Sequence, residues 1–276
     1  MKTIISTLLL FLVSWASAHP SVSIIMDGRG NVYYSDLKQV WKIDMHDKKA
    51  IVVQNVHTHE LYLDKDDNLY GEHLWYNGET ANTWGHYVWK LAVNGTLERI
   101  KPSTTGFLND YSFVHDGQGR MYWADRENSC QKLIRKNKDG SIIKLGDQCF
   151  GDIRRITASS DGTVYLMDLF DLKKIDSNGH VTTLAGSLQK KDREPNSVMG
   201  ISTDKQNNLY VAVYSEHRVK KVTSTGIVSV TAETRIPWSP SGILMALNGD
   251  CWILECSITN SVRVEKISVD GKRTIY

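Results

Sequence analysis

Apolar and polar residues alternate along the chain in short segments that are separated by polar turns. Six segments end in an apolar residue followed by an aromatic one: Val32-Tyr33, Leu69-Tyr70, Met121-Tyr122, Val164-Tyr165, Leu209-Tyr210 and Cys251-Trp252. These aromatic residues recur at intervals of 37 to 52 residues. A period of this length is typical of a four-stranded propeller blade with its turns, and it exceeds the units of helical or leucine-rich solenoids.

A second apolar segment follows each aromatic residue and predicts a third strand in every repeat. These segments are residues 40–43, 88–91, 133–136, 172–175, 219–222 and 264–267. Turns such as Asn94-Gly95 and Asp270-Gly271 follow, and glycine supplies the positive φ that a tight hairpin needs. Fourth strands are expected after them, as at residues 51–53 and 273–275.

The pattern therefore predicts an all-β fold, a six-bladed β-propeller with four antiparallel strands per blade. Six units use up the chain, so no strand is left over for exchange between the first and last blades. We expect the ring to close by the packing of blade against blade.

The first 18 residues differ from the rest. A short apolar run follows Lys2 and ends in Ala16-Ser17-Ala18, the small-x-small pattern of a signal peptidase site. We predict a signal peptide at 1–18, cleaved after Ala18, and a single propeller domain at 19–276. No later segment is long and apolar enough to span a membrane, so the mature protein is expected to be secreted or periplasmic.

The composition narrows the possible partners. The chain has 276 residues, 41% of them hydrophobic and 23% charged, with a net charge of +2. This balance suits a folded core and excludes nucleic-acid binding by bulk electrostatics. No phosphate loop, dinucleotide fingerprint or Gly-x-Ser-x-Gly elbow is present. The partner expected from the sequence is therefore a small-molecule ligand or another protein.

The four cysteines fall into two pairs. Cys130 and Cys149 are predicted to lie in loops on the same face of the propeller, where an oxidising compartment permits a disulfide. Cys251 and Cys256 lie five residues apart in one strand and on opposite sides of its pleat, so they are expected to stay free and buried.

The two faces of the predicted ring differ. The turns before the aromatic residues are uniform hairpins, whereas the opposite face carries irregular loops, the longest at residues 71–86. Repeat folds place binding sites on the variable face. Four aromatic residues there are candidates for stacking on a ligand or for core packing: Trp75, Tyr76, Trp84 and Trp238.

The repeat motifs resemble a known family. Asp204-x-x-x-Asn208-Leu209-Tyr210 and Asp27-x-x-x-Asn31-Val32-Tyr33 are similar to NHL repeats. The chain thereby resembles the six-bladed gluconolactonase and luciferin-regenerating-enzyme group, the peptidylglycine amidating lyases and bacterial NHL proteins. This resemblance implies a propeller, and its members include metal-dependent lactonases, zinc lyases and binding modules, so the activity depends on the site.

Alignment of the blades predicts the residues around the central channel. One level consists of Val22, His59, Tyr111, Arg154, Met199 and Ser241. The lactonase resemblance implies a divalent cation, usually calcium, held by Glu, Asn and Asp side chains. This level contains none of those residue types, and Arg154 stands where a cation would be held, so a calcium-dependent lactonase is the third alternative.

Blade two offers a different cluster. His57, His59 and Glu60 are expected to converge with Glu72 and His73 of a neighbouring strand. Imidazoles with a carboxylate suit zinc or a similar divalent metal, and the candidate ligands are His57, His59, Glu60 and His73. This resembles in kind the histidine zinc site of the amidating lyases. The alternative is a set of hydrogen-bonded channel histidines that hold no metal.

The remaining site predictions concern the substrate. Arg154 is expected either to orient an anionic substrate or to form an ion pair with Asp125, Asp152 or Asp168. The catalytic candidates are His59, His73, Arg154 and Tyr111, with Glu60 as a further proton carrier. The substrate-binding candidates are Asn109, Asp152, Asn196 and Trp238. The ring of Asp36, Asp125 and Asp168 is expected to be structural, and His86 and His217 are explained by the repeat.

These observations favour an exported propeller enzyme, a hydrolase or lyase that acts on a small polar or anionic substrate at the channel mouth and possesses a metal or acid–base histidines. The alternative is a non-catalytic propeller that uses the same face to bind a ligand or a protein.

Overall fold

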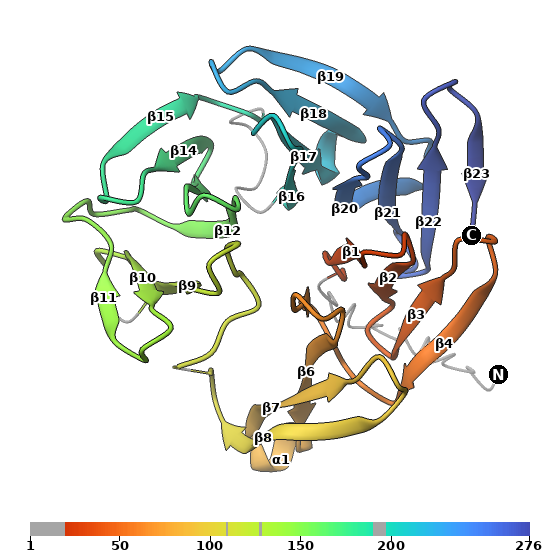
Figure 1. Ribbon diagram of the computed structural model, residues 1–276, viewed down its shortest axis with the longest axis horizontal. Coiled ribbons are helices and arrows are strands. Elements are labelled where there is room, and N and C mark those ends of the chain that lie inside the picture. The colour runs from red at the N-terminus through yellow and green to blue at the C-terminus, as the bar shows by residue number, and fades with distance from the viewer. Residues whose placement is uncertain (1–19, 109, 127–128, 190–196) are drawn as a thin grey trace, which may run out of the picture.

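The protein is a ring of six antiparallel sheets around a central axis (Figure 1). The computed structural model describes residues 20–108, 110–126, 129–189 and 197–276, so the predicted signal peptide lies outside the described residues. The predicted six-bladed β-propeller is confirmed. Within the described ranges, no helix has the length and apolar character needed to cross a membrane.

Each blade runs outward from an inner strand beside the axis. Blade one contains β1 (Ile24–Met26), β2 (Val32–Ser35), β3 (Gln39–Ile43) and β4 (Lys49–Gln54). Blade two contains β5 (Leu61–Leu63), β6 (Leu69–Tyr76), β7 (Trp84–Leu91) and β8 (Leu97–Thr105), with the short helix α1 (Gly78–Ala81) between β6 and β7. Blade three contains β9 (Met121–Asp125), β10 (Lys132–Lys136) and β11 (Ile142–Lys144).

The second half of the ring repeats the four-stranded pattern. Blade four contains β12 (Ile153–Ala158), β13 (Val164–Asp168), β14 (Asp171–Ile175) and β15 (Val181–Ala185). Blade five contains β16 (Val198–Thr203), β17 (Leu209–Val213), β18 (Arg218–Val222) and β19 (Val228–Glu233), with a 3-10 turn at Tyr214–Glu216. Blade six contains β20 (Trp238–Met245), β21 (Cys251–Ser257), β22 (Val262–Ile267) and β23 (Arg273–Ile275).

Blade three departs from the predicted four strands, because its sheet has three. Residues 112–115 take the inner position but pair with β9 only through a bridge between His115 and Met121. The hydroxyl of Ser112 donates to the Tyr122 carbonyl at 2.6 Å, and the imidazole of His115 bonds the Ser112 carbonyl at 2.8 Å. These side chains bond to backbone carbonyl groups that would otherwise accept hydrogen bonds from a neighbouring strand, so the inner segment is irregular.

A carboxylate in the inner turn explains the recurring aromatic residue. In four blades, the tyrosine hydroxyl donates to the turn aspartate. The pairs are Tyr33–Asp27 at 3.0 Å, Tyr70–Asp64 at 2.9 Å, Tyr122–Asp116 at 2.7 Å and Tyr210–Asp204 at 3.2 Å. Each of these carboxylates also accepts backbone N–H bonds from its own turn. The hydrogen bonds fix the hairpin between the first two strands of the blade.

The predicted outer hairpins are confirmed. Gly95, Gly140, Gly179 and Gly271 have φ values of +89°, +85°, +88° and +84° in the turns that precede the fourth strands. A residue with a Cβ is strained at such angles, so glycine is required there.

The ring closes by side-chain packing, as predicted. The last strand, β23, pairs with β22 in its own blade, and one buried cluster joins Val32 and Tyr34 of blade one to Trp252 and Leu254 of blade six. The two ends of the described chain therefore meet at one blade interface (Figure 1). Because no strand is shared, the stability of this interface comes from buried apolar area.

The cysteine predictions are also confirmed. Cys130 and Cys149 form a disulfide with a Cα–Cα separation of 5.1 Å. Cys251 and Cys256 are free and buried.

The Asp–Tyr bond can be tested at Tyr122, whose side chain is fully buried. The Tyr122→Phe variant should lower the free energy of unfolding by about 1–3 kcal/mol, because the Asp116 carboxylate loses a short buried donor. Burial acts to raise the pKa of Asp116, but hydrogen bonds from Tyr122 and Arg120 lower it overall. The loss should therefore be complete at pH 7 and diminish as the pH falls below about 4. Urea titration of both proteins measures this difference in the free energy of unfolding. Tyr76→Phe, at an exposed tyrosine, is the control and should leave stability unchanged.

Candidate functional site

A central cavity of about 1140 Å³ runs between the blades. Its middle is apolar, with Leu61, Ile156 and Ile201 in the wall. Polar groups gather where the loops between blades enter the inner strands, which is the face that the sequence predicts to be functional. The polar and aromatic residues of this mouth are His59, Glu60, Glu72, His86, Phe107, Tyr111, Asp125, Arg126, Arg154 and Arg155.

β-bulges in the inner strands shape the wall. The pairing of β12 with β13 shifts between Ile153 and Ile156, that of β16 with β17 between Val198 and Gly200, and that of β20 with β21 between Pro240 and Gly242. The extra residues include Arg154, Met199 and Ser241, which belong to one predicted channel level. A bulge re-aims side chains next to a site. Of that predicted level, Val22, His59, Tyr111, Arg154 and Met199 line the cavity.

Glu72 joins two imidazoles at the mouth. One carboxylate oxygen lies 3.4 Å from His59 Nδ1, and the other lies 3.5 Å from His86 Nε2. His86 Nδ1 donates to the Gly106 carbonyl at 2.9 Å, so its other nitrogen faces the carboxylate. The Glu72 carboxylate therefore lies between the two imidazoles and can pair with either ring when that ring is protonated.

The strand pairing of blade two holds Glu72 in place. Its carbonyl accepts hydrogen bonds from the Trp89 indole at 2.9 Å and from the Thr58 hydroxyl at 2.6 Å. The Trp89 ring lies over Gly71, where an added Cβ would come within 2.1 Å of it. Glycine at 71 therefore admits the indole, and the indole fixes the strand that carries Glu72.

The structure brings His57 to His59, with their Nε2 atoms 3.3 Å apart. It places His73 elsewhere: Nδ1 of His73 accepts the backbone N–H of His57 at 3.1 Å, and its ring stacks on Tyr87. Burial lowers the pKa values of His57 and His73, so both are neutral at pH 7. Neither residue lines the cavity. His57 orients His59, and His73 supports the backbone of His57.

Glu60 lines the cavity beside this cluster. Burial and the nearby Glu72 charge raise the pKa of its carboxyl group, while Arg155, His59 and Arg126 act to lower it. A carboxyl group with a raised pKa can donate a proton near neutral pH.

Arg154 lines the cavity, and its guanidinium contacts the Asp152 carboxylate at 2.5 Å. Of the two roles predicted for Arg154, the structure shows the ion pair. Asp152 is therefore occupied by Arg154 and does not itself line the cavity. Tyr111 does line it, packed edge-on against Phe113 at 5.3 Å.

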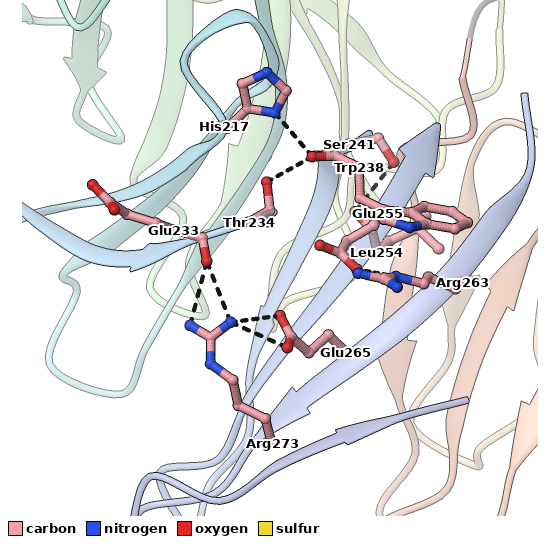
Figure 2. Close-up of polar contacts among 10 residues, drawn as sticks. All are labelled: His217, Glu233, Thr234, Trp238, Ser241, Leu254, Glu255, Arg263, Glu265 and Arg273. Carbon is pink, nitrogen blue, oxygen red and sulfur yellow. Dashed lines mark hydrogen bonds and ion pairs between the residues drawn. The ribbon is translucent and has the colours of Figure 1, made fainter. Parts of the chain in front are cut away.

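Trp238 lies in blade six with one face of its ring covered. The guanidinium carbon of Arg263 lies 4.1 Å from the ring centroid, and Arg263 donates to Glu255 at 2.5 Å (Figure 2). The Glu255 side chain is fully buried, so this pair is part of the structure of the blade. Trp238 does not line the cavity. Asn109 and Asn196, the other predicted substrate contacts, lie outside the described residues.

Two of the three aspartates predicted to be structural have structural partners, and the third, Asp125, lines the cavity. Asp36 accepts the Trp41 indole N–H at 2.8 Å, and Asp168 accepts the backbone N–H of Gly151 at 2.9 Å. His217 bonds the Trp238 carbonyl at 2.9 Å, which agrees with its assignment to the repeat (Figure 2).

Glu72 has no role of its own in the cluster predicted from the sequence, His86 was assigned to the repeat, and Phe107 was not predicted. His86 was assigned to the repeat because His217 occupies the matching place, yet only His86 faces a carboxylate and the cavity. Phe107 packs edge-on against Trp84 at 4.7 Å and leaves 69% of its surface exposed beside His86. The unusual length of the β6–β7 hairpin was the available signal for Glu72 and His86, whereas Phe107 lies after β8.

The predicted metal ligands do not all converge. Among the described residues, no group of three or more His, Cys, Asp or Glu side chains is placed to hold a metal ion. His57 and His59 supply two adjacent nitrogens, whereas His73 bonds the backbone. Metal binding stays a prediction.

No family model matches the chain, and no curated protein matches it. The chain is similar in structure to several solved propellers. A virginiamycin B lyase from Staphylococcus aureus, solved as a catalytically inactive histidine-to-alanine variant with quinupristin, is 14% identical, with a TM-score of 0.55 over 92% of this chain and 82% of that one. A Xanthomonas campestris gluconolactonase is 12% identical, with a TM-score of 0.55 over 85% and 83%. A luciferin-regenerating enzyme is 13% identical, with a TM-score of 0.56 over 88% and 85%.

These similarities confirm the predicted resemblance to the gluconolactonase and luciferin-regenerating-enzyme type of propeller at the level of the fold. The NHL assignment of the repeats stays a prediction.

The placement of Glu72 can be tested at Trp89, its positioning residue. Trp89→Phe keeps most of the packing but removes the N–H that bonds the Glu72 carbonyl, so stability should fall by about 1 kcal/mol. The environment of His59 and His86 should change with it, seen as shifted imidazole signals in NMR pH titrations. Trp41→Phe is the control: it removes the indole bond to Asp36 and should leave those two signals unmoved. Unchanged signals in Trp89→Phe would show that this bond does not position Glu72.

Proposed function

We propose that this protein is an exported propeller enzyme, a lyase or hydrolase that acts on a small polar or anionic substrate in the central cavity. The observation that carries the proposal is the Glu72 carboxylate, shared between two imidazoles that line the same cavity mouth. Two titratable rings whose environments differ can serve as base and acid in one reaction.

The roles follow from the hydrogen bonds. His59 Nδ1 faces Glu72, so the proposed base is Nε2 of His59, whose contact with His57 Nε2 at 3.3 Å the substrate would have to displace. His86 Nδ1 donates to the Gly106 carbonyl, so for His86 to act as the acid its ring must be doubly protonated, with the transferable proton on Nε2 facing Glu72. The Glu72 carboxylate lies between them and stabilises whichever ring is positively charged.

In a lyase reaction, His59 removes a proton from the carbon next to an electron-withdrawing group. The electron pair left on that carbon forms a double bond as the bond to the leaving group breaks, and His86 protonates the leaving oxygen. In a hydrolysis, His59 would take the proton from water as the water oxygen bonds to the carbonyl carbon. The adduct would then collapse with cleavage of the bond to the leaving oxygen, which His86 would protonate, so that one water is consumed.

The comparisons support this proposal through two points. Lyases and lactonases are among the propellers that share the fold, and one such lyase is catalytically inactive when a histidine is replaced by alanine. The sequence of residues 1–18 and the disulfide between Cys130 and Cys149 support export. The alternative is a non-catalytic propeller that binds a ligand or a protein, and such a protein would convert no substrate.

The test is a substrate panel followed by mass spectrometry. The panel includes gluconolactone and quinupristin, which is present in the lyase structure. Ring opening by elimination leaves the mass unchanged, whereas hydrolysis adds the mass of one water, so the product identifies the reaction.

On any substrate that is turned over, His59→Gln should lower kcat by about 100-fold or more, because general base catalysis contributes about that factor. The melting temperature should change little, since His59 is not in the core. His180→Gln is the matched control, because His180 lies in an exposed turn of blade four with its side chain 81% exposed. A His59→Gln variant that loses stability and keeps its activity would make His59 a structural residue.

A metal-bound form of the same site is a second candidate. Two nitrogens bound tetrahedrally to zinc at about 2.0–2.1 Å lie about 3.3–3.4 Å apart, and the Nε2 atoms of His57 and His59 are 3.3 Å apart. A divalent metal there would supply Lewis acidity and an activated water.

Elemental analysis of the untagged protein tests this candidate. About one equivalent of zinc or a similar metal should be present in the wild type and lost in the His57→Ala/His59→Ala double variant, while His180→Gln keeps it. Calcium that is unaffected by the double variant would instead support the lactonase-like alternative, and absence of metal would leave the acid–base site alone.

A further inference from the structure

The wall of the cavity in blade four contains an arginine without an ionic partner. Arg155 follows Arg154 in the bulge of β12, and both side chains line the cavity. Arg154 is paired with Asp152, whereas no carboxylate of the described residues lies within ion-pair distance of Arg155. Within this part of the chain, Arg155 therefore lacks the carboxylate partner that Arg154 has, and this leaves its positive charge available to a bound anion.

The guanidinium of Arg155 is poorly satisfied. Its only hydrogen bond within the described part of the chain is from Nη2 to the Met199 sulfur at 3.6 Å, a weak acceptor. Its Nε is buried and has no partner. A guanidinium carries five donors, and burial without an acceptor is costly, so most of this donor capacity is available to a ligand in the cavity.

Three charged groups act on Arg155. Burial lowers the pKa of Arg155, the Glu60 carboxylate opposes this effect, and the positive charges of Arg126 and Arg154 lower the pKa further. Arg126 also lines the cavity and spends one Nη2 hydrogen bond on the Ile153 carbonyl. An anion bound to Arg155 would remove the repulsion between the arginines and supply the missing acceptors.

We propose that Arg155 binds a carboxylate group of the substrate. One guanidinium without an ionic partner matches a monoanion, and its planar pair of N–H donors matches the two oxygens of a carboxylate. Binding there would place the rest of the molecule toward the acid–base groups of blade two. This inference names the substrate class of the proposed enzyme and so rests on that function for its biological meaning, but the anion site itself can be tested without turnover.

Sodium benzoate and inorganic phosphate are the probes. Protein labelled with 15N is titrated with each anion at constant ionic strength, and the arginine Nε–H signals are followed by NMR. One signal, absent from Arg155→Lys, should shift saturably with benzoate and less with phosphate. Arg155→Lys should weaken benzoate binding by about tenfold or more, because a lysine cannot form the bidentate contact. Arg154→Gln should retain the shift.

A stability measurement separates a ligand site from a structural one. Arg155→Met removes a buried charge that has no ionic partner, so the melting temperature should be unchanged or higher. Arg263→Met is the matched control: it leaves the buried Glu255 without its partner and should lower the melting temperature (Figure 2).

Two results would overturn the proposal. One is equal benzoate affinity in wild type and Arg155→Lys. The other is the absence of a saturable shift up to about 50 mM benzoate, a concentration at which even millimolar binding would be detected. Tighter binding of phosphate than of benzoate would overturn the carboxylate assignment, and a lowered melting temperature in Arg155→Met would make the residue structural. If benzoate binds through Arg155 but the His59→Gln variant keeps full activity, the anion site is supported and the proposed acid–base mechanism is rejected.

Discussion

The hydrogen bond from the repeat tyrosine to the turn aspartate is the interaction on which the rest of the structure depends. In four blades it closes the hairpin between the inner strand and its neighbour, from Tyr33 and Asp27 in blade one to Tyr210 and Asp204 in blade five. An inner strand is short and faces the channel, so it has little apolar area of its own to bury. The carboxylate supplies the missing stability through charge-assisted bonds to the turn amides and the phenol. The inner strands can then carry polar residues toward the channel without loss of the fold.

That freedom is used unevenly around the ring. Blade five presents Met199 and Ile201 to the cavity, whereas blade two presents His59, Glu60 and Glu72. Blade four presents two arginines from a bulge, which lets consecutive residues reach the same cavity. Bases and carboxylates therefore stand on one part of the wall and guanidinium groups on another. A substrate with an acidic proton and a carboxylate would meet complementary groups at both ends, which unites the two proposals made for this cavity.

Buried ion pairs elsewhere show what a purely structural arginine looks like in this fold. Arg263 bonds Glu255 and covers Trp238, and Arg273 bonds Glu265 and the Glu233 carbonyl across the interface between blades five and six (Figure 2). In each case the guanidinium donates to a nearly or fully buried carboxylate. Arg155 has no such partner, and it is this contrast within one chain that distinguishes a binding group from a structural one.

The sequence by itself determined the number of blades, the third and fourth strands, the glycine turns, the Cys130–Cys149 pairing and the channel level that includes His59 and Arg154. All of these depend on periodicity, which is a local property repeated along the chain. The tertiary structure alone decided the irregular inner segment of blade three, the placement of Glu72 between two imidazoles and the difference between Arg154 and Arg155. These depend on which neighbour a side chain meets across strands. His73 illustrates the reason: it shares a strand with Glu72, but the alternating pleat turns it away from the cavity to the backbone of His57.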